Sequence, residues 1–148
     1  MRLFLIVMIL LLGISETKYY DLALKNCNQR GMFNWTIHGW WPEYNATSWP
    51  QFCNPHRFNE FNQSSIETIL PFLREYWNAC EDWPINSYGL WKHEWEKHGT
   101  CTQLSVPTYF GQTINNYLFL SGNNFVNNCC EKEKSNCLIH YKNDHWSC

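Results

Sequence analysis

The chain has 148 residues, with 11 Lys and Arg against 13 Asp and Glu, and a formal net charge of −2 at pH 7. This length suits a single domain. A charge so close to neutral argues against a broad basic surface that grips phosphate backbones. Aromatic residues make up 18% of the chain, including nine Trp. Aromatic faces can bind bases or sugars where bulk charge cannot, although most of these rings are expected to fill the core.

The N-terminal segment predicts a secretory signal peptide. Arg2 precedes an unbroken apolar run over residues 3–12, and the small residues Gly13 and Ser15 follow. The run is short for a membrane span, which needs about 20 residues. We therefore expect residues 1–17 to be a signal peptide and residues 18–148 to form one domain, with a signal anchor as the alternative. The mature protein is then extracellular, or endolysosomal, and not membrane-bound.

The cysteines and sequons agree with export. Eight cysteines follow the apolar run: Cys27, Cys53, Cys80, Cys101, Cys129, Cys130, Cys137 and Cys148. An even number in a secreted chain predicts up to four disulfides, with the pairing left open. Sequons that predict glycosylation, where they are exposed, begin at Asn34, Asn45 and Asn62. Asn34 is the least suited to a glycan because it lies inside an apolar, strand-like segment.

The first half of the chain predicts one strand and one helix. Residues 32–41 are rich in aromatic and β-branched types, which predicts a buried strand that ends at the turn of Pro42. Residues 42–63 resemble a long loop. Apolar side chains then recur at three- and four-residue steps over 66–77, which predicts an amphipathic helix with a serine cap and a kink at Pro71.

The second half predicts two more helices. Residues 82–87 read as a loop, and residues 90–98 as a helix that ends at Gly99 as a cap. Residues 109–120 are a weaker helix candidate. From residue 123 onward the sequence is polar and rich in cysteine, and no element is assigned to it.

The segment WKHEWEKHGTC, residues 91–101, carries an unusual group of titratable side chains. A helix advances about 100° per residue, so two histidines, a lysine and a carboxylate fall within one arc of about 140°. These four are His93, Glu94, Lys97 and His98. Trp91 and Trp95 lie beside this arc as the packed side, and Glu96 points elsewhere, into solvent.

Three interpretations of this arc compete. It could be an ordinary polar helix face with ion pairs such as Glu94 with Lys97. A zinc site fails on spacing, because the two histidines are five residues apart and the zinc motif needs four. The third interpretation is proton transfer at a phosphate, with His98 as acid or base and Lys97 and His93 holding an anionic oxygen. Cys101 fits half of a disulfide better than a nucleophile.

A second histidine stands in IHGWWP, residues 37–42, where His38 is placed near the end of the predicted strand. Together, the two segments resemble the T2 ribonuclease family, which carries IHGLWP and, some fifty residues later, WxxHEWxKHGTC. Only Trp40, in place of Leu, departs from these motifs. The resemblance covers residues 31–112, and within the family it is strongest to the ribonucleases secreted by parasitic flatworm eggs. The chain resembles a member shortened at both ends of the domain.

The resemblance implies a fold of the α+β class, with a central, mainly antiparallel sheet, packed helices and disulfide staples. It implies the disulfides Cys27–Cys80 and Cys53–Cys101, and leaves the other four cysteines unassigned. It also implies catalytic and binding roles for named side chains. The catalytic residues are His38, Glu94, Lys97 and His98, and the substrate-binding residues are His93, Trp41, Glu43 and Trp49.

In the implied reaction, His98 takes the proton of the ribose 2′-OH, which attacks the adjacent phosphorus, and His38 protonates the leaving 5′-oxygen. Glu94 and Lys97 stabilise the developing charge, and His93 binds the phosphate. Trp41 and Trp49 sandwich a base, to which Glu43 hydrogen-bonds. No metal or other cofactor is expected, and DNA is inert because it lacks the 2′-OH.

These expectations describe a secreted, glycosylated, monomeric endoribonuclease that cleaves single-stranded RNA through a 2′,3′-cyclic phosphate and leaves a 5′-OH end. The alternative is a secreted, cysteine-rich effector or binding protein that keeps the same scaffold with impaired catalysis. The intact pair of His38 and His98 favours the enzyme, and the shortened ends favour the alternative.

Overall fold

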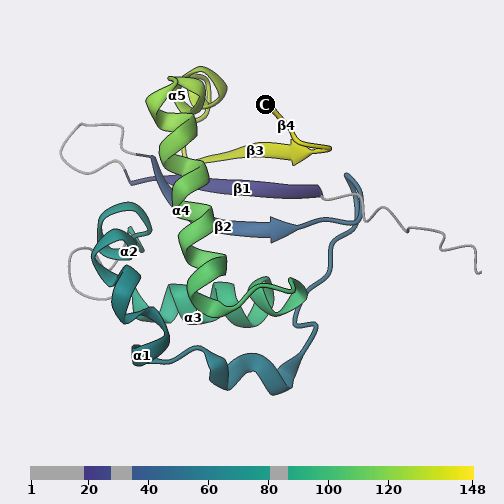
Figure 1. The fold of residues 1–148 in the computed structure, drawn as a ribbon. Helices are drawn as coiled ribbons and strands as arrows, with labels where there is room; N and C mark the ends of the chain where they lie inside the picture. The colour runs from purple at the N-terminus through teal and green to yellow at the C-terminus, as the bar shows by residue number, and fades with distance from the viewer. Residues whose placement is uncertain (1–18, 28–34, 81–86) are drawn as a thin grey trace, which may run out of the picture.

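The computed structural model describes residues 19–27, 35–80 and 87–148, and its centre is a four-stranded antiparallel sheet. The strand order is β2-β1-β3-β4, so the N-terminal strand lies in the middle of the sheet (Figure 1). An antiparallel sheet with helices packed against it confirms the expected α+β class. The strands are β1 (Tyr19–Asn26), β2 (Trp35–Pro42), β3 (Asn136–Lys142) and β4 (His145–Ser147).

The helices pack on one face of the sheet and beyond its β2 edge. In Figure 1, α4 crosses in front of the strands, α3 runs beside β2, and α5 lies at the β3 end. The α-helices are α1 (Gln63–Ile66), α2 (Leu70–Tyr76), α3 (Tyr88–Lys97), α4 (Val106–Gly122) and α5 (Phe125–Cys130). The 3₁₀ helices are η1 (Pro55–Glu60), η2 (Glu67–Ile69) and η3 (Gly99–Cys101).

The hydrophobic core lies between α4 and the sheet. Leu22, Trp40 and Ile139 come from three neighbouring strands and are almost fully buried, as are Tyr109 and Phe110 of α4. The hydroxyl of Tyr109 donates to the carbonyl of Trp40 over 2.8 Å, which satisfies the one polar atom of a fully buried ring. Buried aromatic rings thus make up much of the core, and this core fixes β2 against α4.

Strand β2 contains a β-bulge at His38. Ala23 of β1 faces Gly39, whereas the next residue, Leu24, faces Ile37, so His38 is the extra residue on β2. Ile37 and Trp40 are both buried in the core although they are three residues apart, a spacing that regular alternation does not allow. The bulge reverses the alternation and re-aims a side chain. The strand that was predicted over 32–41 continues to Pro42, and His38 lies inside it and not near its end.

The predicted helix over 66–77 is broken into three short elements. Asn62, rather than a serine, caps α1: its side chain accepts from the backbone N–H of Ser65, whose hydroxyl accepts from Asn62 N–H in return. The chain tightens to 3₁₀ geometry over η2, and α2 begins with Pro71 in its first turn. Pro71 therefore separates two helices instead of kinking one. The predicted loop over 42–63 also contains η1.

The helix over 90–98 is present as α3, but its end differs from the prediction. Gly99 begins the 3₁₀ turn η3 and does not act as a left-handed cap. A Cβ at this position would lie against the ring of Trp95, so the glycine is needed for close packing. The weaker candidate over 109–120 is also present, as the longer α4. The unassigned segment after residue 123 forms α5 and the β3–β4 hairpin, whose turn holds Asn143 and Asp144 at positive φ.

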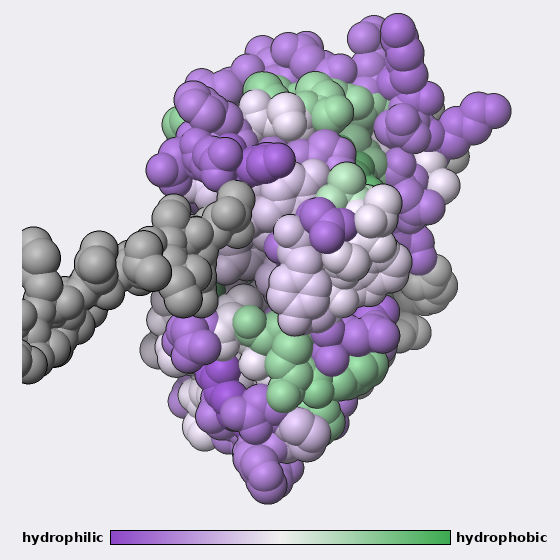
Figure 2. Space-filling view, turned by 90° about the vertical axis from the view of Figure 1, so that its right-hand side faces the viewer, coloured by the Kyte–Doolittle hydropathy of each residue, from purple (hydrophilic) through white to green (hydrophobic). Residues whose placement is uncertain are grey.

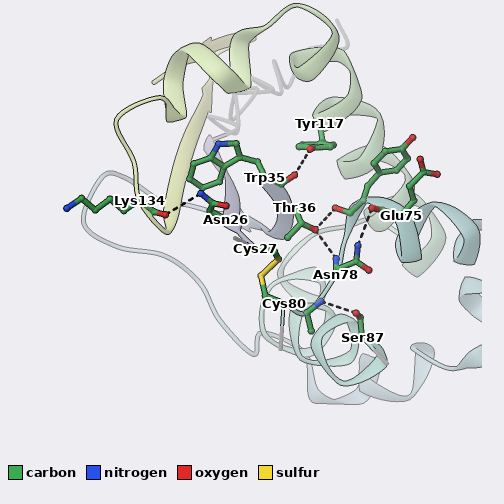
Figure 3. Close-up of a disulfide and its surroundings, with 12 residues drawn as sticks. Asn26, Cys27, Trp35, Thr36, Glu75, Asn78, Cys80, Ser87, Tyr117 and Lys134 are labelled. Carbon is green, nitrogen blue, oxygen red and sulfur yellow. Dashed lines mark hydrogen bonds between the residues drawn. A yellow bond between two sulfur atoms is a disulfide. The ribbon is translucent and has the colours of Figure 1, made fainter. Parts of the chain in front are cut away.

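Four disulfides staple the domain. Two of them are the pairs that the resemblance implied, Cys27–Cys80 and Cys53–Cys101, and the other two are Cys129–Cys148 and Cys130–Cys137. The close-up in Figure 3 shows the first disulfide among hydrogen bonds that join β2 to the helices and β1 to Lys134, which precedes β3. One of these bonds runs from the Thr36 hydroxyl to the carbonyl of Tyr76, over 2.9 Å. Each bridge contributes roughly 2–4 kcal/mol to stability.

The predicted signal peptide, the Asn34 sequon and most of the predicted loop over 82–87 lie outside the described residues. Asn45 and Asn62 are both exposed, so both sequons are accessible to glycosylation. In the ranges that the structure describes, no helix combines the length and apolar character that crossing a membrane needs.

Candidate active site

The two motif segments meet where β2 approaches the C-terminal half of α3. His38 and Trp41 come from β2, and Glu94 comes from α3, whose last turn ends at His98. In Figure 1 this region lies toward the right-hand side, between the arrowhead of β2 and the end of α3. Two segments some fifty residues apart in the sequence therefore form one site.

Trp41 joins the two segments. Its indole Nε1–H donates to Oε2 of Glu94 over 2.9 Å, and its ring stacks on His98 with the centroids 5.2 Å apart. The same Glu94 oxygen lies 4.0 Å from Nε2 of His98. Glu94 and His98 are only 1% and 3% exposed. One indole therefore orients both a buried carboxyl group and a buried imidazole.

Gly39 makes this close approach feasible. A Cβ at position 39 would lie 2.9 Å from Cδ1 of Trp41, and closer still to Nε1 of Trp41 and Oε2 of Glu94. Contacts below 3.0 Å essentially never occur for a real Cβ. The glycine of IHGWWP is therefore the residue that lets β2 and α3 come within hydrogen-bonding distance of each other.

The bulge places His38 beside Trp41, on the same side of the strand as the site. The two rings meet edge to face, with centroids 6.0 Å apart and planes at 84°. The backbone carbonyl of His38 accepts from the indole N–H of Trp77 over 3.0 Å. Trp77 is fully buried, so this bond ties the bulge to the core.

Burial and neighbouring charges shift the pKa values of His98 and Glu94 in opposite directions. Desolvation, and then the positive charges of Lys97, His93 and His38, lower the pKa of His98 to about 3. Desolvation raises the pKa of Glu94 to about 7, against the Trp41 hydrogen bond and Lys97, which lower it. Near pH 5 the imidazole is neutral and the carboxyl group is protonated. Within the described ranges, the buried Nδ1 of His98 has no hydrogen-bond partner.

The four side chains of the predicted arc do not share one environment. Glu94 and His98 are buried, whereas His93 is exposed and meets the ring of Phe52 edge to face, with centroids 6.4 Å apart. Desolvation and the charge of Lys97 lower the pKa of His93. On the outer side of the helix, Glu96 is partly exposed and pairs with Lys92. The helix therefore has a buried side that faces β2 and an outer side that carries an ion pair.

A cavity of about 320 Å³ opens beside His98. This volume is at the lower end of the range for small-ligand sites. Trp49 is 53% exposed on its wall. The face in Figure 2 is the end of the molecule at the right of Figure 1, where pale and green side chains gather between hydrophilic regions. The residues that line the cavity are Asp21, Trp41, Glu43, Ala46, Trp49, Lys97, His98 and Leu138.

The two sequence motifs do not include all the residues that line this cavity. Asp21 and Leu138 come from β1 and β3, which lie outside both motifs, and His140 of β3 hydrogen-bonds to Asp21 over 2.7 Å. A signal was present for Asp21, a single carboxylate in the apolar run YYDLAL. Desolvation, and then the charge of Asp21, raise the pKa of Glu43 to about 7, against His140, which lowers it.

The comparisons with known proteins agree with the two motifs. The profile of the Ribonuclease T2 family matches residues 15–128. Over 108 residues the chain is 40% identical to the pig (Sus scrofa) ribonuclease T2, covering 67% of this chain and 48% of the pig protein. The human (Homo sapiens) ribonuclease T2 is 38% identical over 101 residues, which are 62% of this chain and 35% of the human protein. The chain thus spans half or less of the length of these curated relatives.

Solved structures show the same fold. The crystal structure of human RNase T2 superposes with a TM-score of 0.57 and 28% identity, over 79% of this chain and 64% of that one. The Japanese pear S3-RNase superposes with a TM-score of 0.64 and 16% identity, over 87% and 88%. Since the family profile covers well over half of the sequence, the chain belongs to the Ribonuclease T2 family.

Proposed function

We propose that this protein is a metal-independent endoribonuclease that cleaves single-stranded RNA by attack of the ribose 2′-OH on the adjacent phosphorus. The observation that carries the proposal is the convergence of His38, Glu94 and His98 on the single indole of Trp41. Two imidazoles that contact one indole, one of them on the cavity wall, can carry out the two proton transfers that this reaction needs. The nucleophile belongs to the substrate, so proximity supplies most of the remaining advantage.

The proton transfers follow from the environments of the two histidines. His98, which burial keeps neutral at acidic pH, accepts the proton of the 2′-OH while the 2′-oxygen forms its bond to phosphorus. His38 in its protonated form gives a proton to the 5′-oxygen as the P–O5′ bond breaks. The products are a 2′,3′-cyclic phosphate end and a 5′-OH end. Water can open the cyclic phosphate in a second step.

Glu94 and Lys97 are proposed to stabilise the negative charge that develops on the phosphorane oxygens. With its pKa near 7, Glu94 is protonated at acidic pH and can donate an O–H hydrogen bond to such an oxygen. Lys97 lies on the cavity wall next to His98, where its ammonium group can pair with the same charge. His93 is exposed, so we assign it to phosphate binding at the edge of the site.

Base binding is assigned to the cavity. Trp41 and Trp49 both line it and present aromatic surface, which is worth roughly 1–3 kcal/mol per stacked base. Glu43 lines the same cavity, which supports a role in hydrogen-bonding a base edge. Stacking suits a chain whose net charge is −2, because it does not depend on attraction of the phosphate backbone.

We further propose that the protein is secreted, or delivered to an endolysosomal compartment, as a monomer after loss of its signal peptide. The apolar N-terminal segment supports export, and the four disulfides suit an oxidising compartment. Asn45 is the sequon best prepared for glycosylation, since it is exposed and its side-chain oxygen accepts hydrogen bonds from both the backbone and the hydroxyl of Thr47.

The test compares two fluorescent oligonucleotides of the same sequence, ordinary RNA and RNA that carries 2′-O-methyl groups throughout, incubated with the mature chain at pH 5 in the presence of a chelator. The proposal predicts that the ordinary RNA is cut to 2′,3′-cyclic phosphate and 5′-OH ends and that the methylated RNA survives. Equal cleavage of both substrates would contradict attack by the 2′-OH. RNA binding without cleavage of either substrate would instead support the non-catalytic binding protein.

A further inference from the structure

The proposed reaction leaves one pair of titratable side chains at the cavity unused. Asp21 of β1 and His140 of β3 are hydrogen-bonded, with Oδ1 and Nδ1 2.7 Å apart. Asp21 is 8% exposed and lines the cavity that also holds Trp41 and His98. A buried carboxylate with its own imidazole partner at a cavity wall is a candidate for ligand recognition.

The sheet register explains why this pair faces the site. Asp21 lies opposite Trp41 on one neighbouring strand and opposite His140 on the other. Cross-strand partners project to the same face of a sheet. Trp41 contacts Glu94 and His98 on that face, so the row that begins at its indole continues through Asp21 to His140.

The hydrogen bond to His140 orients the Asp21 carboxylate and leaves it acceptor capacity. A carboxylate has about four lone-pair sites over its two oxygens, and the imidazole uses one of them at Oδ1. The ring of His140 is itself stacked against Tyr19, with centroids 6.5 Å apart, so its orientation is fixed from both sides. Asp21 also acts on Glu43 through its negative charge, and both carboxyl groups line the same cavity.

We propose that Asp21, held in place by His140, is a second carboxyl group that contacts the base in the Trp41–Trp49 cavity, in addition to Glu43, and that it selects guanine. This inference rests on the proposed function, since it assumes that the cavity binds a base of RNA. Asp21 would touch the base, whereas His140 is a positioning residue that acts through Asp21.

The choice of guanine follows from the hydrogen-bond pattern of each base. Guanine presents two N–H donors side by side, N1–H and the exocyclic amino group, and a carboxylate can accept both at once. Adenine and cytosine place a ring nitrogen acceptor beside their amino group, and that acceptor would face a carboxylate oxygen. Uracil has a single N–H between two carbonyl oxygens. A carboxylate on the cavity wall therefore matches guanine best.

The experiment measures the dissociation constants of the four nucleoside 3′-monophosphates, and of the four 5′-monophosphates, by calorimetry on the full mature chain. The expected result is a preference for the guanine nucleotide in one of the two series. In that series, Asp21→Asn should reduce the preference of guanine over adenine by roughly 5- to 150-fold, the range for one bidentate contact. Asp144→Asn, which removes an exposed carboxylate on the β3–β4 turn, is the matched control and should leave the ratio unchanged.

Two variants of His140 separate positioning from folding. His140→Phe keeps a ring beside Tyr19 and removes the N–H donor, so the guanine preference should fall. His140→Asn loses the ring and keeps an N–H near the place of Nδ1, so the preference should be largely restored. Because the readout is a ratio between nucleotides, a general loss of stability does not imitate the expected effect.

Two results would overturn the inference. One is a wild-type chain that binds all four nucleotides of both series equally, and the other is an Asp21→Asn variant that weakens all of them by the same factor. Each can occur in a chain that still cleaves RNA, in which case the proposed function stands and the base assignment fails. Conversely, guanine-selective binding by a chain that does not cleave RNA would uphold the assignment and refute the proposed function.

Discussion

Replacing Gly39 with alanine tests how closely β2 and α3 must approach. The added methyl group would lie 2.9 Å from Cδ1 of Trp41 and closer still to Nε1 of Trp41 and Oε2 of Glu94, the two atoms of a 2.9 Å hydrogen bond. These neighbours must move, and the bond between them is then lost. Overpacking of a close-packed site costs about 1–3 kcal/mol, and leaving a buried polar group without its partner costs about 1–3 kcal/mol more.

The expected outcome for Gly39→Ala is a loss of roughly 2–6 kcal/mol in the free energy of unfolding, together with a fall in RNA cleavage of about a hundredfold from misplaced groups. The matched control is Gly111→Ala in α4, where a Cβ would have no atom within 4 Å. There alanine should stabilise by about 0.5–1 kcal/mol, since glycine weakens a helix interior. Urea unfolding and an RNA cleavage assay measure both. A Gly39→Ala variant as stable and active as the wild type would refute this account of the glycine.

Three further predictions concern the charged groups. The rate of cleavage should fall above about pH 7, as Glu94 loses its proton, and below about pH 3, as His98 gains one; a rate that climbs steadily to pH 9 would exclude these roles. Trp41→Phe keeps a ring on His98 but removes a hydrogen bond that lowers the pKa of Glu94, so the alkaline limb of the pH profile should move to higher pH. A limb at the same pH would mean that Glu94 does not set it. Between about pH 4.5 and 7, Glu94 is protonated in the folded protein and ionised in the unfolded chain, so the wild type loses stability as the pH rises through this window and Glu94→Gln does not. The free energy of unfolding of Glu94→Gln relative to the wild type should therefore rise by up to about 1.4 kcal/mol per pH unit, as measured by urea unfolding at pH 4.5, 5.5 and 6.5. A difference that stays constant with pH would contradict the raised pKa.

The sequence predicted those parts of the fold that local chemistry determines. The helices over 90–98 and 109–120 were predicted and are present as α3 and α4, whereas the periodic stretch over 66–77 is broken into three short elements. The two motifs pointed to one site because each carries side chains that make sense only together. The resemblance supplied two of the disulfides. The pairing of Cys129 with Cys148 and of Cys130 with Cys137 depends on how the β3–β4 hairpin lies against α5, which no local pattern records.

What the sequence did not reveal depends on contacts between distant segments. The bulge at His38 results from the register of β2 against β1, and helical angles alone placed exposed His93 on the same arc as buried Glu94. The serine cap was wrong because Asn62, one turn earlier, forms a reciprocal hydrogen bond with Ser65. Asp21 was not included in the site because its relevance depends on its two strand neighbours, and β3 was not predicted at all.

The central claim is that His98 is the base of an RNA-cleaving reaction. The most direct measurement compares the mature chain with its His98→Ala variant on a fluorescent RNA at pH 5 and pH 7, after unfolding curves have shown that both are folded. General base catalysis contributes typically about 10²- to 10⁴-fold, so the variant should lose at least a hundredfold in rate at both pH values. Equal rates for the two proteins would contradict the account.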